Sequence, residues 1–240
     1  MEINLTKKND AWIAGLKDMP VQKKFSQKGE EFYIIYIFQH ILPESKYFVD
    51  LGAGDGFTLS NTALIKHYGW NGLMMDADNK GNEEVKKEFI TATNIIQLFE
   101  KYSVPEKFDL LSIDLDGNDY WVLDELLGEY RPRLIVAEFN GTIPYGVDKV
   151  MEYNEAHVWN NDDYYGASLD AFKRLAKRHN YTAIFCHDSL NVYFLADEEL
   201  CNPQTDFNVS HETQQYHPHN PNGVWYNFNE IKEQLNKPKT

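Results

Sequence analysis

Short apolar runs alternate with amphipathic segments along most of the chain. The apolar runs predict strands, and the segments between them predict helices. The predicted strands are 47–51, 72–76, 88–91, 108–113 and 134–137, and the predicted helices are 60–68, 94–102 and 121–127. The stronger strand runs are apolar throughout, which is typical of parallel strands that are covered on both faces. This order of elements predicts an α/β domain built on a mostly parallel sheet.

The end of the pattern differs from its beginning. Residues 168–179 predict an amphipathic helix with Ser168 as its N-cap. Predicted strands at 181–186 and 192–195 follow, with only a handful of residues between them. Because a parallel crossover needs a dozen or more residues, these two strands must be antiparallel. We therefore expect a Rossmann-like, doubly wound, mostly parallel seven-stranded sheet that ends in an antiparallel hairpin.

Two further segments flank this core. Residues 1–45 predict an N-terminal helical extension and residues 201–240 a polar C-terminal tail, on either side of a main domain at 46–200. Within the extension, the apolar run 32–42 is compatible with a helix or with a buried strand, and Pro43 ends it in either case. The chain is thus expected to form one domain with an addition at each end.

A long insertion interrupts the main domain at residues 141–167. Compact domains seldom keep an unstructured loop longer than about 15 residues unless it has a function. The insertion is rich in aromatic residues, whose faces suit a sugar or an aromatic ligand. We expect it to form a substrate wall or lid; the alternative is an ordered loop that packs its rings against the core.

The C-terminal tail gives weaker signals. It carries His211, His217 and His219, but their spacing matches no recognised metal-ligand pattern. A solvated or partner-covering tail is the simpler interpretation. Residues 223–226, followed by Phe228, predict a short element that folds back on the domain.

Composition and charge limit the partners. The 240 residues are 42% hydrophobic, which is enough for a packed core, and their net charge is −14. This acidic excess argues against nucleic acid, which basic patches usually bind, and favours neutral, cationic or metal-bridged substrates. Cys186 and Cys201 form no spaced pattern, so we expect neither a zinc site nor a disulfide framework. Charged residues break the apolar runs near the N-terminus, which predicts a cytoplasmic protein with no membrane partner.

A glycine-rich loop follows the first predicted strand, with the sequence Asp50-Leu51-Gly52-Ala53-Gly54-Asp55-Gly56. Glycines let the backbone turn sharply and approach a ligand closely. The spacing Gly-x-Gly-x-Gly matches neither the dinucleotide fingerprint nor a P-loop. Two neighbouring aspartates make the loop a poor site for phosphate and a good one for a cationic ligand. Asp76 ends the second strand, where a carboxylate can accept both hydroxyls of a ribose.

Five segments together resemble the FkbM-like branch of class I S-adenosylmethionine-dependent methyltransferases, and more distantly the macrocin-type sugar O-methyltransferases. They are Ser-Gln-Lys-Gly-Glu at 26–30, the segment 48–62, Gly-Trp-Asn-Gly-Leu at 69–73, Ser-Ile-Asp-Leu-Asp-Gly-Asn-Asp-Tyr-Trp at 112–121, and Tyr-Gly-Ala-Ser-Leu at 165–169. The similarity covers roughly residues 24–198. Members are generally O-methyltransferases of sugars, lipids or natural products, and their sheet ends in the antiparallel hairpin expected above.

The resemblance implies a binding site for S-adenosylmethionine. The residues expected to form it are Gln27, Asp50, Gly52, Gly54, Gly56, Asp76 and Asp114. Relatives often carry Glu where Asp76 stands, so the carboxylate that would reach the ribose is shorter in this chain.

Oxygen-bearing side chains gather after two neighbouring predicted strands. Those expected to hold a divalent metal are Asp114, Asp116, Glu138 and Asn140. Such ligands suit Mg²⁺ or Ca²⁺, and the macrocin-type enzymes resemble this chain in placing acids at the ends of these strands. The alternative is a tight turn at 116–118 with Asp119 as a helix N-cap. Without a metal, the candidate general bases are Asp114, Glu138, His157 and His187.

These features predict an O-methyltransferase that acts on a hydroxyl of a small molecule or saccharide, with S-adenosylmethionine and Mg²⁺ as cofactors and a homodimer as the expected assembly. Asn118-Asp119-Tyr120-Trp121 lacks the prolines of the motif that nucleic-acid amine methyltransferases use. Two alternatives stay open: a non-catalytic, cofactor-binding scaffold, and a nicotinamide-dependent oxidoreductase on a related fold.

Overall fold

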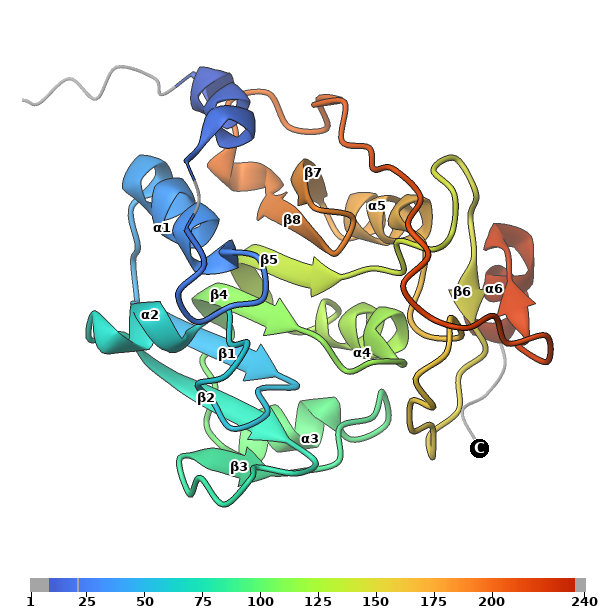
Figure 1. Ribbon diagram of the computed structural model, residues 1–240. Helices are drawn as coiled ribbons and strands as arrows, with labels where there is room; N and C mark the ends of the chain where they lie inside the picture. The colour runs from blue at the N-terminus through green and yellow to red at the C-terminus, as the bar shows by residue number, and fades with distance from the viewer. Residues whose placement is uncertain (1–8, 21, 236–240) are drawn as a thin grey trace, which may run out of the picture.

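A seven-stranded sheet forms the centre of the molecule, in the order β3-β2-β1-β4-β5-β8-β7 (Figure 1). The computed structural model describes residues 9–20 and 22–235. The strands of the sheet are β1 (Tyr47–Leu51), β2 (Asn71–Asp76), β3 (Val85–Lys87), β4 (Lys107–Ile113), β5 (Arg131–Glu138), β7 (Tyr181–His187) and β8 (Asn191–Ala196). Strands β1 to β5 run parallel, whereas β8 pairs antiparallel with both β5 and β7. The predicted architecture is confirmed: a mostly parallel seven-stranded sheet that ends in an antiparallel hairpin.

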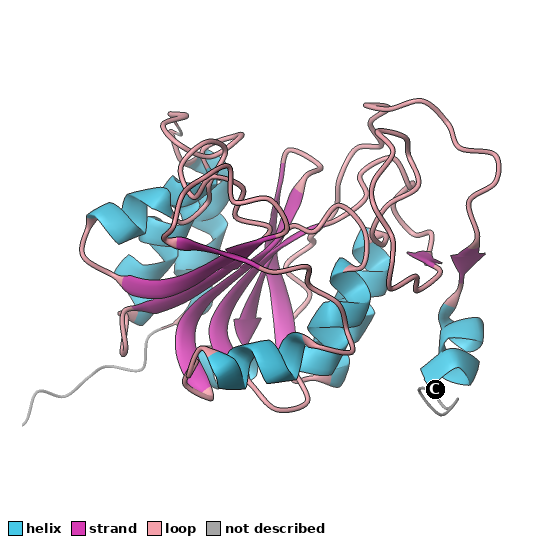
Figure 2. Ribbon diagram, turned by 90° about the horizontal axis from the view of Figure 1, so that it is seen from below, coloured by secondary structure: helices cyan, strands magenta, loops and turns pink. Residues whose placement is uncertain are grey.

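Helices cover both faces of this sheet (Figure 2). The covering helices are η1 (Asp10–Asp18), α1 (Glu30–Ile41), α2 (Ala63–His67), α3 (Ile95–Lys101), α4 (Asp119–Leu126) and α5 (Leu169–Arg178). The described chain also has the short η2 (Asp197–Glu199) after β8 and α6 (Phe228–Leu235) near its end. One buried cluster joins α3, α4 and α5 to one face, and a second joins η1, α1 and α2 to the other. No helix in the described part of the chain is both long and apolar enough to cross a membrane.

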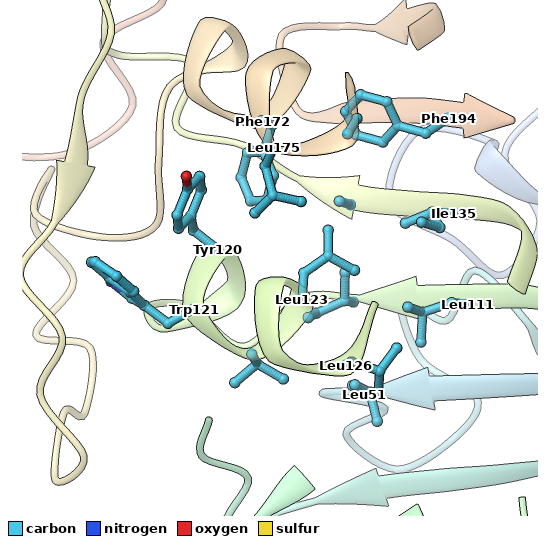
Figure 3. Close-up of a cluster of buried hydrophobic side chains, with 14 of the residues drawn as sticks. Leu51, Leu111, Tyr120, Trp121, Leu123, Leu126, Ile135, Phe172, Leu175 and Phe194 are labelled. Carbon is cyan, nitrogen blue, oxygen red and sulfur yellow. The ribbon is translucent and has the colours of Figure 1, made fainter. Parts of the chain in front are cut away.

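The strands are apolar on both faces because each face has its own helical layer. Leu110 of β4 belongs to the cluster beneath α1, and its neighbour Leu111 belongs to the cluster beneath α4 and α5. Figure 3 shows Leu111 with Leu123 of α4 and Phe172 of α5 in the cluster beneath α4 and α5. Fully burying one such side chain contributes roughly 1.5–3 kcal/mol. Repeated on both faces, this burial holds the parallel strands together. Their carboxyl ends therefore lie side by side at one end of the sheet.

Two sequence-based expectations need correction. Strand β3 covers Val85–Lys87 and not 88–91, because the pairing with β2 ends at Lys87 and the chain then leaves the sheet. The run 32–42 is helical, so its strand interpretation is wrong. Helix α1 is apolar almost all round because it lies between the sheet and η1.

The insertion and the tail form a small unit of their own beside the main sheet. Strand β6 (Val150–Met151) of the insertion pairs antiparallel with β9 (Trp225–Tyr226) of the tail. The prediction that residues 223–226 fold back is therefore confirmed. Figure 2 shows this two-stranded ladder and α6 set apart from the main sheet.

Candidate functional site

A cavity of about 990 Å³ lies at the carboxyl ends of β1, β2, β4 and β5. Its lining has three regions: the glycine loop with Asp76, the carboxylates after β4 and β5, and aromatic side chains from the insertion and the tail. Open α/β sheets bind ligands at the carboxyl ends of their strands. The volume is at the upper end of ordinary ligand pockets, so it has room for a nucleoside-sized cofactor and a second small molecule.

Gly52 brings the end of β1 against the end of β4. Its φ is +85°, and a Cβ atom there would stand 1.6 Å from the backbone oxygen of Asp114. The amide groups of Gly52 and Ala53 both donate to the carbonyl of Met75 at the end of β2, at 3.0 and 3.1 Å. The loop is thus fixed by backbone contacts on both sides.

Gly54 and Gly56 play different roles from each other. Gly54 has a φ of +55°, lines the cavity and has open space where a Cβ would project, as close approach of a ligand requires. Gly56 is not part of the lining, and a Cβ there would come within 2.9 Å of Val85. The expected ligand contact of Gly56 is therefore replaced by packing of the loop against β3.

Asp76 stands beside Gly54 at the floor of the cavity. One carboxylate oxygen accepts the amide of Gly54 at 2.8 Å, and the other accepts the amide of Asp78 at 2.7 Å. Each oxygen keeps a further lone pair for a ligand hydroxyl. The carboxylate is therefore oriented by the loop and still able to accept two hydroxyls.

The two loop aspartates differ in their surroundings. Asp50 is 4% exposed and accepts a hydrogen bond from Thr62 Oγ1 at 2.6 Å. Burial raises the pKa of Asp50 to about 6, and hydrogen bonds from Thr62, Ser112 and Ser60 oppose this rise. Asp55 instead accepts the amides of Phe57 and Thr58 in an exposed turn outside the cavity lining. Only Asp50 is placed to act on a cationic ligand.

The segment before α1 closes the cavity from the N-terminal side. Buried Glu31 accepts the backbone amides of Lys24 and Phe25, at 3.0 and 2.8 Å, and the hydroxyl of Ser26. Ser26 in turn pairs with Leu59 of the loop after β1. These contacts place Gln27 in the lining, where the sequence analysis expected it.

Three carboxylates meet at the ends of β4 and β5: Asp114, Asp116 and Glu138. One oxygen from each lies within 4.8 Å of the others, and no other such group occurs in the part of the chain that the structure describes. Burial, with the charges of Asp116 and Asp119, raises the pKa of Asp114 to about 8. Burial and the charge of Asp114 raise the pKa of Glu138 well above its usual range. Burial and mutual repulsion therefore both favour the protonated forms of these carboxyl groups.

Asn140, the fourth residue of the predicted metal set, and the nearby Asp119 hold the local backbone instead. Asp119 accepts the amides of Leu115 and Gly117, at 2.7 and 2.9 Å, so its carboxylate closes a tight turn, and the N-cap of α4 is Asn118. The amide nitrogen of Asn140 donates to the carbonyls of Asp163 and Tyr165, and its oxygen accepts from Thr142. Asn140 thus anchors the insertion, and we leave it out of the metal-ligand set.

The two histidines considered as bases end in different places. His157 lines the cavity with its ring over Gly117, and its buried Nε2 atom has no hydrogen-bond partner among the described residues. His187 is not in the lining; its Nε2 lies 3.1 Å from the carbonyl of Lys28, and its ring contacts Tyr33 and Phe185. Of the two, His157 alone lines the cavity.

Sequence reasoning missed one side of the site. Tyr216 and His217 of the tail line the cavity beside Trp159 and Tyr165 of the insertion. The His217 and Trp159 rings meet edge to face, with centroids 4.8 Å apart. The polar surroundings of Tyr216 and His217 indicated a solvated tail. The only sequence signal was an aromatic pair in an otherwise polar stretch.

The three tail histidines do not meet at one point. His217 contacts Trp159, His211 contacts Phe139, and His219 pairs with Asp163 at 2.8 Å. A shared metal site between them is therefore not formed.

The similarities found in comparison with known proteins are distant. No family model and no curated protein matched the chain. Among solved structures, an S-adenosylmethionine-dependent methyltransferase from Clostridium acetobutylicum has 11% identity and a TM-score of 0.38, covering 69% of this chain and 89% of its own. The methyltransferase domain of bacterial CtHen1-C has 14% identity and a TM-score of 0.40, covering 69% and 95%. A putative RNA methyltransferase, PH1948 from Pyrococcus horikoshii, has 11% identity and a TM-score of 0.35, covering 78% and 97%. Similarity at this level says nothing about substrate, so the function is argued from the site.

Proposed function

We propose that the protein is an S-adenosylmethionine-dependent methyltransferase that methylates a hydroxyl of a small molecule or saccharide, which we call the acceptor. One observation carries the proposal: a single cavity joins the glycine loop and Asp76 to the carboxylates Asp114 and Glu138. The first half has the features of a nucleoside site, and the second can remove a proton. Methyl transfer to an oxygen needs both functions side by side.

The glycine-loop half fits the cofactor in shape and charge. Gly54 leaves open space above the backbone, Asp76 can accept both ribose hydroxyls, and Phe89 and Ile90 offer apolar contact for an adenine ring. The bound cofactor would supply a methyl group activated on a positively charged sulfur. Asp50 and the neighbouring carboxylates complement that charge, whereas they would repel the pyrophosphate of a nicotinamide cofactor.

The carboxylate half fits the removal of a proton from the acceptor. Asp114 and Glu138 are close enough to share a hydrogen bond, and their raised pKa values suit proton transfer near neutral pH. His157, with its unpartnered Nε2, is the third candidate base. Methyl transfer also requires that the donor and the acceptor be aligned, and a rigid cavity at the carboxyl ends of the strands supplies this alignment. These groups favour a catalytic protein over a scaffold.

The same carboxylates fit a divalent cation. Asp114, Asp116 and Glu138 would hold it, because three clustered carboxylates are hard ligands and repel one another without a positive charge. A cation there would bind acceptor oxygens and lower the pKa of the hydroxyl.

The charge of the cavity also argues for a small acceptor rather than nucleic acid. Lys28 is the only Lys or Arg among the described residues that line the cavity, and it pairs with Asp188 at 2.7 Å. A phosphate backbone would find no free cation there.

The test of the cofactor site is calorimetric titration with S-adenosylhomocysteine on wild type, Asp76→Ala and the exposed neighbour control Asp78→Ala. We expect micromolar binding to wild type and to the control, and at least tenfold weaker binding to Asp76→Ala. A folded wild-type protein that binds NAD and not the homocysteine compound would contradict the proposal.

The test of the metal site is the midpoint of thermal unfolding with EDTA and with Mg²⁺ or Mn²⁺. We expect the cation to raise the midpoint of wild type and to leave that of Glu138→Gln unchanged. An equal rise in both proteins would remove Glu138 from the site.

A further inference from the structure

The C-terminal tail is bound to the domain along its course past the cavity. Ser189 donates its hydroxyl to the carbonyl of Glu212 at 2.8 Å, and the amide of Gln214 donates to the carbonyl of Gly141 at 3.0 Å. Figure 1 shows the tail, in orange and red, leaving η2 and passing α5 toward β6. The tail thus crosses from the turn between β7 and β8 to the insertion.

A second set of contacts lies just beyond the cavity. Asp163 of the insertion donates its amide to the carbonyl of Pro218 at 3.0 Å and accepts from the amide of Asn220 at 2.7 Å. The same carboxylate lies 2.8 Å from the His219 ring. Tyr216 and His217 lie between these two sets of contacts and are therefore held in place from both sides.

Tyr216 and His217 extend the aromatic surface that the insertion contributes to the cavity. His217 meets Trp159 at 4.8 Å and Tyr165 at 6.1 Å between ring centroids, both nearly perpendicular. The Tyr216 hydroxyl donates to the carbonyl of Asp188 at 3.3 Å, which ties Tyr216 to the turn between β7 and β8. All four rings line the cavity that holds Asp114, Asp116 and Glu138.

We infer that Tyr216 and His217, with Trp159 and Tyr165, form the wall that selects the acceptor, and that this acceptor is an uncharged, ring-shaped polyol. The inference rests on the proposed function and adds the tail to the site. Aromatic rings cover the apolar face of a sugar-like ring, and carboxylates opposite them accept hydrogen bonds from its hydroxyls. A phosphorylated acceptor is disfavoured because Lys28 is already paired with Asp188.

The wall is formed before the acceptor arrives. Asn220 also donates to the Asp162 side chain at 2.7 Å, and β6 pairs with β9 just beyond it. A wall that is already ordered loses little conformational entropy on binding. Removing its rings should therefore weaken acceptor binding without disturbing the cofactor half.

The experiment compares two double variants that remove the same residue types. Tyr216→Ala/His217→Ala deletes the part of the wall that the tail supplies, and His67→Ala/Tyr68→Ala deletes an exposed pair at the C-terminal end of α2, outside the cavity lining. Each protein, loaded with S-adenosylhomocysteine, is titrated by saturation-transfer NMR with a panel of neutral methyl glycosides and their 6-phosphates. Calorimetry with S-adenosylhomocysteine alone checks the cofactor site in the same samples.

We expect at least one neutral glycoside to bind wild type and the α2 control, with at least tenfold weaker binding to the wall variant and no binding of the phosphates. Equal binding to both variants, preferred binding of a phosphate, or no glycoside binding at millimolar concentration would overturn the inference. If S-adenosylhomocysteine binds normally in those cases, the proposed cofactor site stands and only the acceptor assignment fails.

Discussion

Gly52 and Gly54 lie two positions apart in one loop, yet they meet different requirements. Both have positive φ, which any residue with a Cβ adopts at a cost. At Gly52 a Cβ would collide with the backbone of Asp114, so the requirement comes from the fold. At Gly54 the space is open toward the cavity, so the requirement comes from the ligand.

This difference predicts opposite outcomes for two alanine variants. Gly52→Ala must displace backbone at the β1–β4 junction, and we expect a loss of about 3 kcal/mol or more in the free energy of unfolding. Gly54→Ala adds only the strain of a left-handed alanine, about 1 kcal/mol, but its methyl group enters the cofactor space. Urea unfolding and titration with S-adenosylhomocysteine separate the two effects. Tight binding by Gly54→Ala would show that the cofactor does not approach this position.

Among the elements, the ends of β4 and β5 opposite the cavity are joined by one buried arginine. The side chain of Arg133 is 11% exposed and donates to Asp109 at 2.8 Å, to Glu199 at 2.6 and 2.8 Å, and to the carbonyl of Leu42 at 2.7 Å. It thus links β5 to β4, to η2 and to the end of α1. These contacts lie near the amino end of β5, whereas Glu138 lies at its carboxyl end. The residues that stabilise the fold here are thus separate from the residues of the candidate site.

Arg133→Met should therefore lower stability without changing the cofactor site. The variant leaves Asp109, which is 0% exposed, without its cation, and breaking such a buried pair costs about 3–5 kcal/mol. The control Lys66→Met breaks the more exposed pair with Glu84 and should cost less than about 1 kcal/mol. Urea unfolding measures both. A much weaker affinity of folded Arg133→Met for S-adenosylhomocysteine would contradict the separation of this stabilising cluster from the candidate site.

The elements also show what the sequence could predict. Strands with two covered faces are continuous apolar runs, so β1, β2, β4 and β5 were found, and with them the carboxyl-end residues Asp76, Asp114 and Glu138. The same burial made α1 resemble a strand, because a helix between two layers loses its polar face. Tyr216 and His217 could not be found, since their position depends on hydrogen bonds between the tail and residues distant in the sequence. Asn140 was misassigned for the same reason: its partners are visible only in three dimensions.

For the whole molecule, negative charge is a property of the site as well as of the surface. The chain has 37 acidic and 23 basic residues. The cavity lining holds Asp50, Asp114, Asp116 and Glu138 but few basic side chains that could neutralise their charge. Their raised pKa values mean that the folded protein keeps protons that the unfolded chain would release. The free energy of unfolding must therefore depend on pH, and the carboxyl groups of the cavity make it fall as pH rises.

In metal-free buffer, we expect stability to fall as pH rises from about 5 to about 8. A carboxyl group whose pKa is raised by folding contributes fully below its unfolded value, and that contribution is lost as pH passes the folded value. The folded values are about 6 for Asp50 and about 8 for Asp114, against 3.8 for an ordinary aspartate. For Asp50, which is 4% exposed, the difference corresponds to about 3 kcal/mol. Groups with lowered pKa, such as Asp109, act in the opposite direction, but only below about pH 4.

Asp114→Asn isolates the contribution of the cluster. The amide keeps the size of the side chain and removes one of three charges, so the variant should exceed wild type in stability at pH 8 by on the order of 2 kcal/mol and by much less at pH 5. The exposed control Asp206→Asn should follow wild type at both values. Urea unfolding in EDTA provides the measurement, and a wild-type protein that grows more stable toward pH 8 would refute the argument. Adding Mg²⁺ at pH 8 should remove the advantage of Asp114→Asn, because a bound cation would offset in wild type the repulsion that the variant lacks.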